Sequence, residues 1–164
     1  MNEPDSAFIR PHVAAGVLFL DDDSQVLLVV PSYKDYLDIP GGYVETGESP
    51  RAAAQREVKE ELGIEPPIGR LLVADWWRTS IDDTGGPKLL FIFDGGHLPQ
   101  AQLDRITVDG TEVTDFKFHD VEGLASVTIP RLTNRIQHAV AARREGATSY
   151  LEDGQPTNGP APSV

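Results

Sequence analysis

The chain alternates short apolar runs with polar breaks, a pattern typical of strands joined by turns. Residues 14–20 and 25–30 are continuous apolar runs with the length of buried strands, and the polar cluster of residues 21–24 separates them. The pattern therefore predicts a β-hairpin. Residues 38–42 contain one proline and two glycines, which break any regular element that follows the hairpin.

A helix is predicted to begin after Ser49 and to end before Gly63. Serine is a favoured N-cap, Pro50 suits the first helical position, and glycine commonly ends a helix. The apolar stripe of this helix consists of Ala54, Val58 and Leu62. A neighbouring face presents the carboxylates of Glu57, Glu60 and Glu61.

Further elements are expected on the C-terminal side of this helix. The apolar pattern predicts strands at residues 70–77, 88–93 and 112–119, with a turn at residues 82–87. Residues 130–145 have helical spacing. Strands and helices in this order favour an α/β fold.

The length of 164 residues suits a single domain. We expect a polar lead over residues 1–11 and the domain over residues 12–146. Residues 147–164 are rich in glycine and proline and have little to bury, so a disordered tail is expected there.

The composition limits the classes of binding partner and the cellular environment that we expect for this chain. The net charge of −12 disfavours nucleic-acid polymers, which need clustered Lys and Arg, but not a small phosphorylated substrate whose charge a metal neutralises. Without cysteine there are no disulfides, which fits a reducing cytoplasm. No signal peptide and no apolar run of about 20 residues is visible, so no membrane span is expected.

The three clustered glutamates indicate a metal site. Like charges three or four residues apart on an exposed helix cost about 0.2–0.5 kcal/mol per pair. A bound divalent cation reverses this repulsion, because hard cations such as Mg²⁺ prefer carboxylate oxygens. A site of this kind commonly serves phosphate chemistry.

The run from Gly42 to Ile64 resembles the Nudix box, G-x5-E-x7-R-E-U-x-E-E-x-G-U with U aliphatic, at every fixed position. The resemblance to this MutT-like hydrolase family implies a Nudix-type α/β/α sandwich with a mixed β-sheet. It also implies Mg²⁺ as cofactor, with Mn²⁺ as a substitute, and a homodimer, as in many family members.

The resemblance also assigns roles inside the box. Glu57, Glu60 and Glu61 occupy its metal-ligand and catalytic-base positions: Glu60 and Glu61 as ligands, Glu57 as ligand or base. Gly41 matches the position whose backbone carbonyl reaches the metal. Arg56 would hold a carboxylate ionised and oriented; a surface ion pair is the alternative.

Outside the box the assignments are less specific. Family members often take another acid from a loop beyond the sheet as base or ligand. Glu112 is the first candidate and Asp115 the second, and a solvated loop acid is the alternative reading of both. Trp76 and Trp77 alternate across a strand, so one should face the core and the other, assigned as Trp77, can stack on substrate; a purely structural tryptophan is the alternative. The cations that could meet substrate phosphates are Arg78, Lys88 and Arg10.

The leading functional hypothesis is a Mg²⁺-dependent pyrophosphohydrolase that cleaves the phosphoanhydride of a nucleoside diphosphate linked to another moiety. Nucleoside triphosphates, including oxidised ones, are the alternative substrates. A Nudix-fold module that binds a nucleotide without cleaving it is an alternative of another class. No sub-family marker in the sequence decides the substrate.

Overall fold

A computed structural model describes residues 8–78 and 86–157. Its centre is a mixed sheet in the order β6-β2-β1-β5-β4-β7-β8, and the short strand β3 also pairs with β1. The strands are β1 (His12–Leu20), β2 (Val26–Pro31), β3 (Gly41–Tyr43), β4 (Leu71–Trp77), β5 (Lys88–His97), β6 (Val113–His119), β7 (Ser149–Glu152) and β8 (Gln155–Pro156). The helices are α1 (Pro50–Leu62), α2 (Gln100–Leu103), the 3₁₀ helix η1 (Val121–Ser126) and α3 (Pro130–Glu145).

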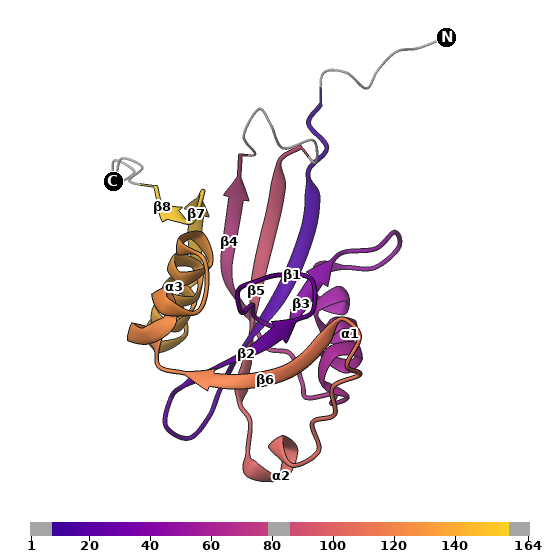
Figure 1. Ribbon diagram of the computed structural model, residues 1–164. Helices are drawn as coiled ribbons and strands as arrows, with labels where there is room; N and C mark the ends of the chain where they lie inside the picture. The colour runs from indigo at the N-terminus through magenta and orange to yellow at the C-terminus, as the bar shows by residue number, and fades with distance from the viewer. Residues whose placement is uncertain (1–7, 79–85, 158–164) are drawn as a thin grey trace.

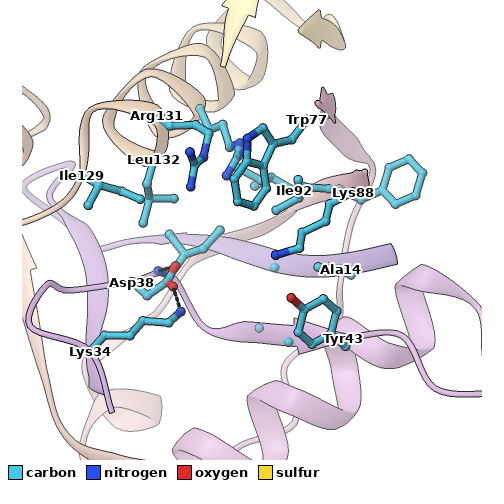
Figure 2. Close-up of a pocket in the computed structure, with 18 of the residues that line it drawn as sticks. Ala14, Lys34, Asp38, Tyr43, Trp77, Lys88, Ile92, Ile129, Arg131 and Leu132 are labelled. Atoms are coloured by element: carbon cyan, nitrogen blue, oxygen red, sulfur yellow. Dashed lines mark hydrogen bonds and ion pairs between the residues drawn. The ribbon is translucent and has the colours of Figure 1, made fainter. Parts of the chain in front are cut away.

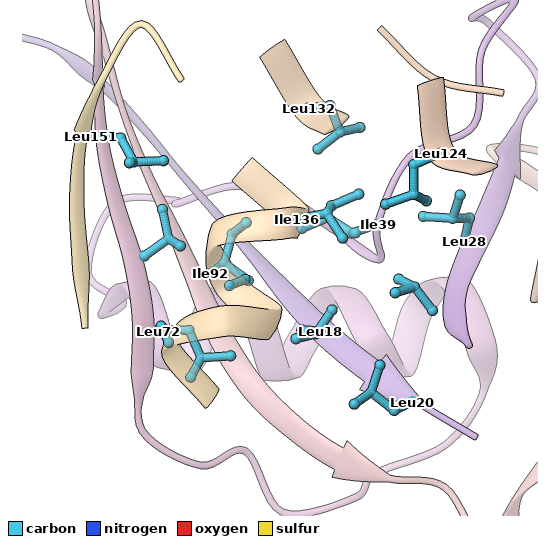
Figure 3. Packing of buried hydrophobic residues seen from close by; sticks show 14 residues of the cluster. Leu18, Leu20, Leu28, Ile39, Leu72, Ile92, Leu124, Leu132, Ile136 and Leu151 are labelled. Carbon is cyan, nitrogen blue, oxygen red and sulfur yellow. The ribbon is translucent and has the colours of Figure 1, made fainter. Parts of the chain in front are cut away.

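Helices α1 and α3 cover opposite faces of the sheet, which makes an α/β/α sandwich (Figure 1). Strand β1 lies between them and supplies both cores. Val17 and Phe19 pack with the cluster that contains the apolar stripe of α1. Leu18 and Leu20 pack with the cluster that contains Ile136 of α3 (Figure 3). A strand buried on both faces reads as one continuous apolar run, which explains the pattern at residues 14–20.

The two helices follow the sequence signals closely. Ser49 caps α1 by accepting a hydrogen bond from the Ala52 amide, and Gly63 ends the helix in the left-handed region at φ 68°. Helix α3 begins at Pro130 and ends at Gly146, which has φ 67°. The described residues contain no helix with the length and apolarity to cross a membrane.

The strand pairing differs from the simple hairpin expected for residues 14–30. Strands β1 and β2 are antiparallel neighbours, but their register joins only Leu20 to Val26. Strand β1 pairs along its length with β5, in parallel, and β2 pairs with β6. The break expected at residues 38–42 also contains the start of β3. Side-chain periodicity marks buried strands but carries no information about long-range partners.

The expectation of a disordered tail over residues 147–164 is wrong for residues 149–156. Strand β7 pairs in parallel with β4, and β8 pairs with β7. Leu151 is fully buried in the α3-side core, and this contact offsets the glycine and proline content of the segment. Residues 158–164, residues 1–7 of the expected lead, and residues 82–85 of the expected turn lie outside the described residues.

Candidate active site

Two glycines bring strand β3 against β1 and α1. Gly41 pairs with Gly16, and a Cβ atom on Gly41 would collide with the backbone carbonyl of Ala15. A Cβ atom on Gly42 would collide with the carboxylate of Glu57. Gly41 therefore needs glycine because backbone fills the space of a side chain, whereas a side chain at Gly42 would displace the end of Glu57.

Glu61 is held by this glycine bend. Its Oε2 accepts a hydrogen bond of 2.9 Å from the Gly41 amide, and only 7% of the residue is exposed. Burial raises the pKa of the Glu61 carboxyl to about 8, although the hydrogen bond from Gly41 opposes the shift. The negative charges of Glu57, Asp38 and Glu112 raise it further. A cation beside Glu61 would relieve both the burial of charge and the repulsion.

Arg56 organises the remaining carboxylates. Its Nη1 lies 2.8 Å from Glu57 Oε1 and 3.0 Å from Glu60 Oε2, and its Nη2 lies 2.7 Å from Glu48 Oε1. The same Nη2 donates to the backbone carbonyl of Tyr43 at 3.0 Å. These contacts raise the pKa of the Arg56 guanidinium, with the bond to Glu48 as the largest cause. The Arg56 guanidinium thus links helix α1 to the preceding loop through its bonds to Glu48 and Tyr43.

The donor chemistry fits a hard cation, although the side chains are arranged around Arg56. In the described part of the chain, no three Asp, Glu, His or Cys side chains are gathered closely enough to hold a metal ion. Burial raises the pKa of Glu57 and the bonds from Arg56 oppose this shift. Glu60 is 57% exposed at its side chain. To share a cation with Glu61, Glu57 and Glu60 must turn from Arg56.

The two acids of the distant loop differ in position. Glu112 lies directly before β6, where its carbonyl accepts a hydrogen bond of 2.8 Å from the Ser32 amide. Its charge raises the pKa of both Glu57 and Glu61, so it belongs to the same electrostatic cluster. Asp115 is exposed within β6 and accepts from the adjacent Phe116 amide at 2.8 Å. Glu112 is therefore the acid of this region that interacts electrostatically with Glu57 and Glu61 of α1.

A pocket of about 300 Å³ opens beside the glycine bend (Figure 2). Trp77 and Lys88, both expected at a substrate site, line it. Arg78 does not line the pocket: it is exposed, and its guanidinium lies 2.8 Å from Asp153 Oδ2. Arg10 is exposed and does not line the pocket either.

Sequence reasoning missed most of the other polar lining, namely Tyr33, Lys34, Tyr36, Asp38, Tyr43, Arg131 and Arg135. Lys34 and Asp38 form an ion pair of 2.6 Å across one turn of the loop between β2 and β3. Only the arginines carried a usable signal. Arg135 lies next to Ile136 on the core-facing side of α3, and a charge on an apolar stripe marks a buried partner or a ligand.

Comparison with known proteins places these features in a family. A model of the NUDIX domain matches residues 10–145. Diphosphoinositol polyphosphate phosphohydrolase 2 of Rattus norvegicus is 49% identical over 53 residues, which are 32% of this chain and 30% of that protein. ADP-ribose pyrophosphatase of Methanocaldococcus jannaschii is 35% identical over 68 residues, 40% of each protein. The chain thus spans well under half the length of these curated relatives.

Two solved structures share the fold. A MutT protein from Methanosarcina mazei Go1 superposes with a TM-score of 0.64 at 22% identity, covering 84% of this chain and 96% of that one. A UDP-X diphosphatase superposes with a TM-score of 0.67 at 21% identity, covering 91% and 70%. At such identity the likeness concerns the fold alone.

Proposed function

This chain belongs to the Nudix family, and from that premise we propose that it is a Mg²⁺-dependent pyrophosphohydrolase acting on a nucleoside diphosphate linked to another moiety. The observation that carries the proposal is the buried Glu61 carboxyl, fixed by the amide of Gly41, a residue that lines the pocket. The ionised form of a carboxyl buried in this way is costly without a cation beside it, which favours a metal site over a binding module that has lost its metal.

The cation would be held by Glu57, Glu60, Glu61 and the carbonyl of Gly41. When bound, Mg²⁺ supplies charge neutralisation at the non-bridging phosphate oxygens. Arg56 orients Glu57 and Glu60 before binding. Glu112 or Glu57 accepts the proton of the attacking water, and Mn²⁺ is expected to substitute for Mg²⁺.

The pocket favours a substrate with a planar group and phosphates. Trp77 and Lys88 line the pocket, and the Trp77 ring already contacts Lys88 at 4.5 Å and Arg131 at 3.7 Å, so a planar group can stack only on the part of the ring that these cations leave open. The name of one relative, an ADP-ribose pyrophosphatase, supports a nucleoside diphosphate linked to another group. Nucleoside triphosphates remain the second candidate. A homodimer, a cytoplasmic location and the absence of nucleic-acid partners stay predictions.

The test is a panel of nucleotide sugars, dinucleotides and nucleoside triphosphates with Mg²⁺ or Mn²⁺, read as release of nucleoside monophosphate or pyrophosphate. We expect metal-dependent turnover of at least one nucleoside diphosphate derivative, and its loss in Glu61→Gln. Binding of a nucleotide without turnover of any member would favour the non-catalytic module. Turnover of triphosphates alone would favour the second candidate.

A further inference from the structure

One wall of the pocket is positively charged and lies on α3, β4 and β5. The Cζ atom of Arg131 lies 3.7 Å from the centroid of the Trp77 ring, and the Nζ atom of Lys88 lies 4.5 Å from it. Figure 2 shows Arg131 and Trp77 together on the side of the pocket across from Lys34, with Lys88 extending from Trp77 toward Tyr43. Arg135, one helical turn after Arg131, lines the same wall. We call Trp77, Lys88, Arg131 and Arg135 the cationic wall.

The arginines of this wall have unused hydrogen-bond donors. Arg135 is only 5% exposed, and its Nε atom is bonded to the buried carboxylate of Asp75. Its Nη2 atom is buried and meets no hydrogen-bond partner among residues 8–78 and 86–157, and the same holds for the Nε atom of Arg131. Buried donors in native proteins nearly always have a partner, so an unpartnered pair beside a cavity points to a ligand acceptor.

In the described part of the chain, the carboxylate of Asp75 does not meet these free donors. Its Oδ2 accepts from the Arg135 Nε, and its Oδ1 accepts from the amide of Gly154 at 3.0 Å, while Arg135 Nη2 stays without a partner. No acidic side chain lies within ion-pair distance of Arg131 or Lys88 in the part of the chain that the structure describes. Two positive charges on this wall are therefore not neutralised.

The N-terminus of α3 adds to the positive electrostatic potential of the cationic wall. Its N-cap residue Ile129 makes no side-chain hydrogen bond to the first turn, so the free amides and the positive end of the helix dipole are not capped. Ile129, Arg131 and Leu132 of this first turn all line the pocket. Burial lowers the pKa of the Arg131 guanidinium and the neighbouring Arg135 lowers it further, although the charges of Asp75 and Asp153 oppose this shift.

We propose that the cationic wall and the first turn of α3 bind a phosphate group on the part of the substrate that lies beyond the anhydride cleaved at the glutamates. The pocket thus lies between the glycine bend, where the Gly41 amide binds Glu61, and the guanidinium donors at α3, which need an anion. The role of this phosphate as part of a substrate rests on the proposed function. The proposal restricts the substrate class: phosphoanhydrides whose second moiety carries an additional phosphate are preferred to those whose second moiety is a neutral sugar.

The first test measures anion binding without metal or turnover. Wild-type protein in EDTA is titrated with inorganic phosphate, against chloride at matched ionic strength, while the melting temperature and tryptophan fluorescence are recorded. We expect phosphate to raise the melting temperature and to change the fluorescence, because Arg131 contacts Trp77. Arg131→Gln should lose most of both responses. Arg144→Gln, an exposed arginine on the same helix, is the matched control and should keep them.

The second test compares two dinucleotides that differ by one phosphate group, NAD⁺ and NADP⁺, by metal-free fluorescence titration. A charged hydrogen bond to the extra phosphate predicts about tenfold or tighter binding of NADP⁺, and Arg131→Gln should remove the difference. Equal affinities in wild type, together with phosphate responses unaffected by Arg131→Gln, would overturn the inference. Because neither test uses hydrolysis, an inactive enzyme that keeps its phosphate preference contradicts only the proposed function.

Discussion

The amide of Gly41 donates a 2.9 Å hydrogen bond to the Glu61 carboxylate, and this bond joins strand β3 to the last turn of α1. A buried carboxylate with one amide donor is oriented but not neutralised. The bond therefore fixes Glu61 at the bend where Gly42 also faces Glu57. It makes Glu61 the residue on which the metal hypothesis depends most directly.

Glu61→Gln should reduce kcat by about two orders of magnitude or more, because the near-isosteric amide can no longer donate a charged oxygen to a cation. The fold should remain, since the amide oxygen can still accept from Gly41. The measurement is Mg²⁺-dependent turnover alongside circular dichroism. Activity equal to wild type in a folded variant would refute the ligand role. Lys59→Gln, an exposed change on the same helix, should leave kcat within about twofold.

Without divalent cations, stability should fall as the pH rises. The pKa of Glu61 is raised by burial to about 8 in the folded protein, whereas in the unfolded chain it stays near 4.5. Between these values the folded state binds more protons, so the free energy of unfolding decreases from about pH 5 to pH 8. Burial raises the pKa of Glu57 in the same direction.

Thermal melts in EDTA across this pH range measure the effect. The fall in melting temperature should be clearly smaller in Glu61→Gln, and Mg²⁺ should reduce it in wild type. An identical pH dependence in both proteins would mean that Glu61 titrates normally.

Substitutions of the two glycines of the bend should differ in their effects: one should lower mainly stability and the other mainly activity. Gly41→Ala places a Cβ atom against the backbone of β1 and should cost about 1–3 kcal/mol of stability. Gly42→Ala meets only the end of the Glu57 side chain, which can move. It should leave stability within about 1 kcal/mol and lower activity about 10–100-fold. Urea unfolding and turnover measured on both variants test this contrast; equal loss of stability would contradict it.

Glu112→Gln should lower kcat more than Asp115→Asn, because only Glu112 belongs to the electrostatic cluster of Glu57 and Glu61. A general base contributes about 10²–10⁴-fold, so a loss of that size with an altered pH–rate profile would identify Glu112 as the base. Unchanged kcat in Glu112→Gln would leave that role to Glu57. The exposed Asp115 serves as the control because its carboxylate accepts a hydrogen bond from the adjacent Phe116 amide of its own strand.

The features that the sequence predicts well are those determined by residues close to one another along the chain. Ser49 and Gly63 mark the ends of α1 through local hydrogen bonds and backbone conformation. The glutamate spacing within that helix likewise predicts the carboxylate cluster beside the glycine bend. The cationic wall depends on α3 meeting β4 and β5, where Arg131 reaches Trp77 across more than fifty residues of chain. Helical periodicity can place Arg131 and Arg135 on one face, but it cannot name the surface that they meet.

The pairing of β7 with β4 extends the folded body past residue 145, where the family match ends. A version of the protein cut at that boundary would expose the backbone edge of β4 and remove the amide that Gly154 gives to Asp75. Such a shortened protein would expose an unpaired strand edge with which other copies of the protein can form β-sheet hydrogen bonds. Expression designs should therefore retain residues through at least Pro156, and aggregation of the shorter form should not be read as instability of the catalytic half.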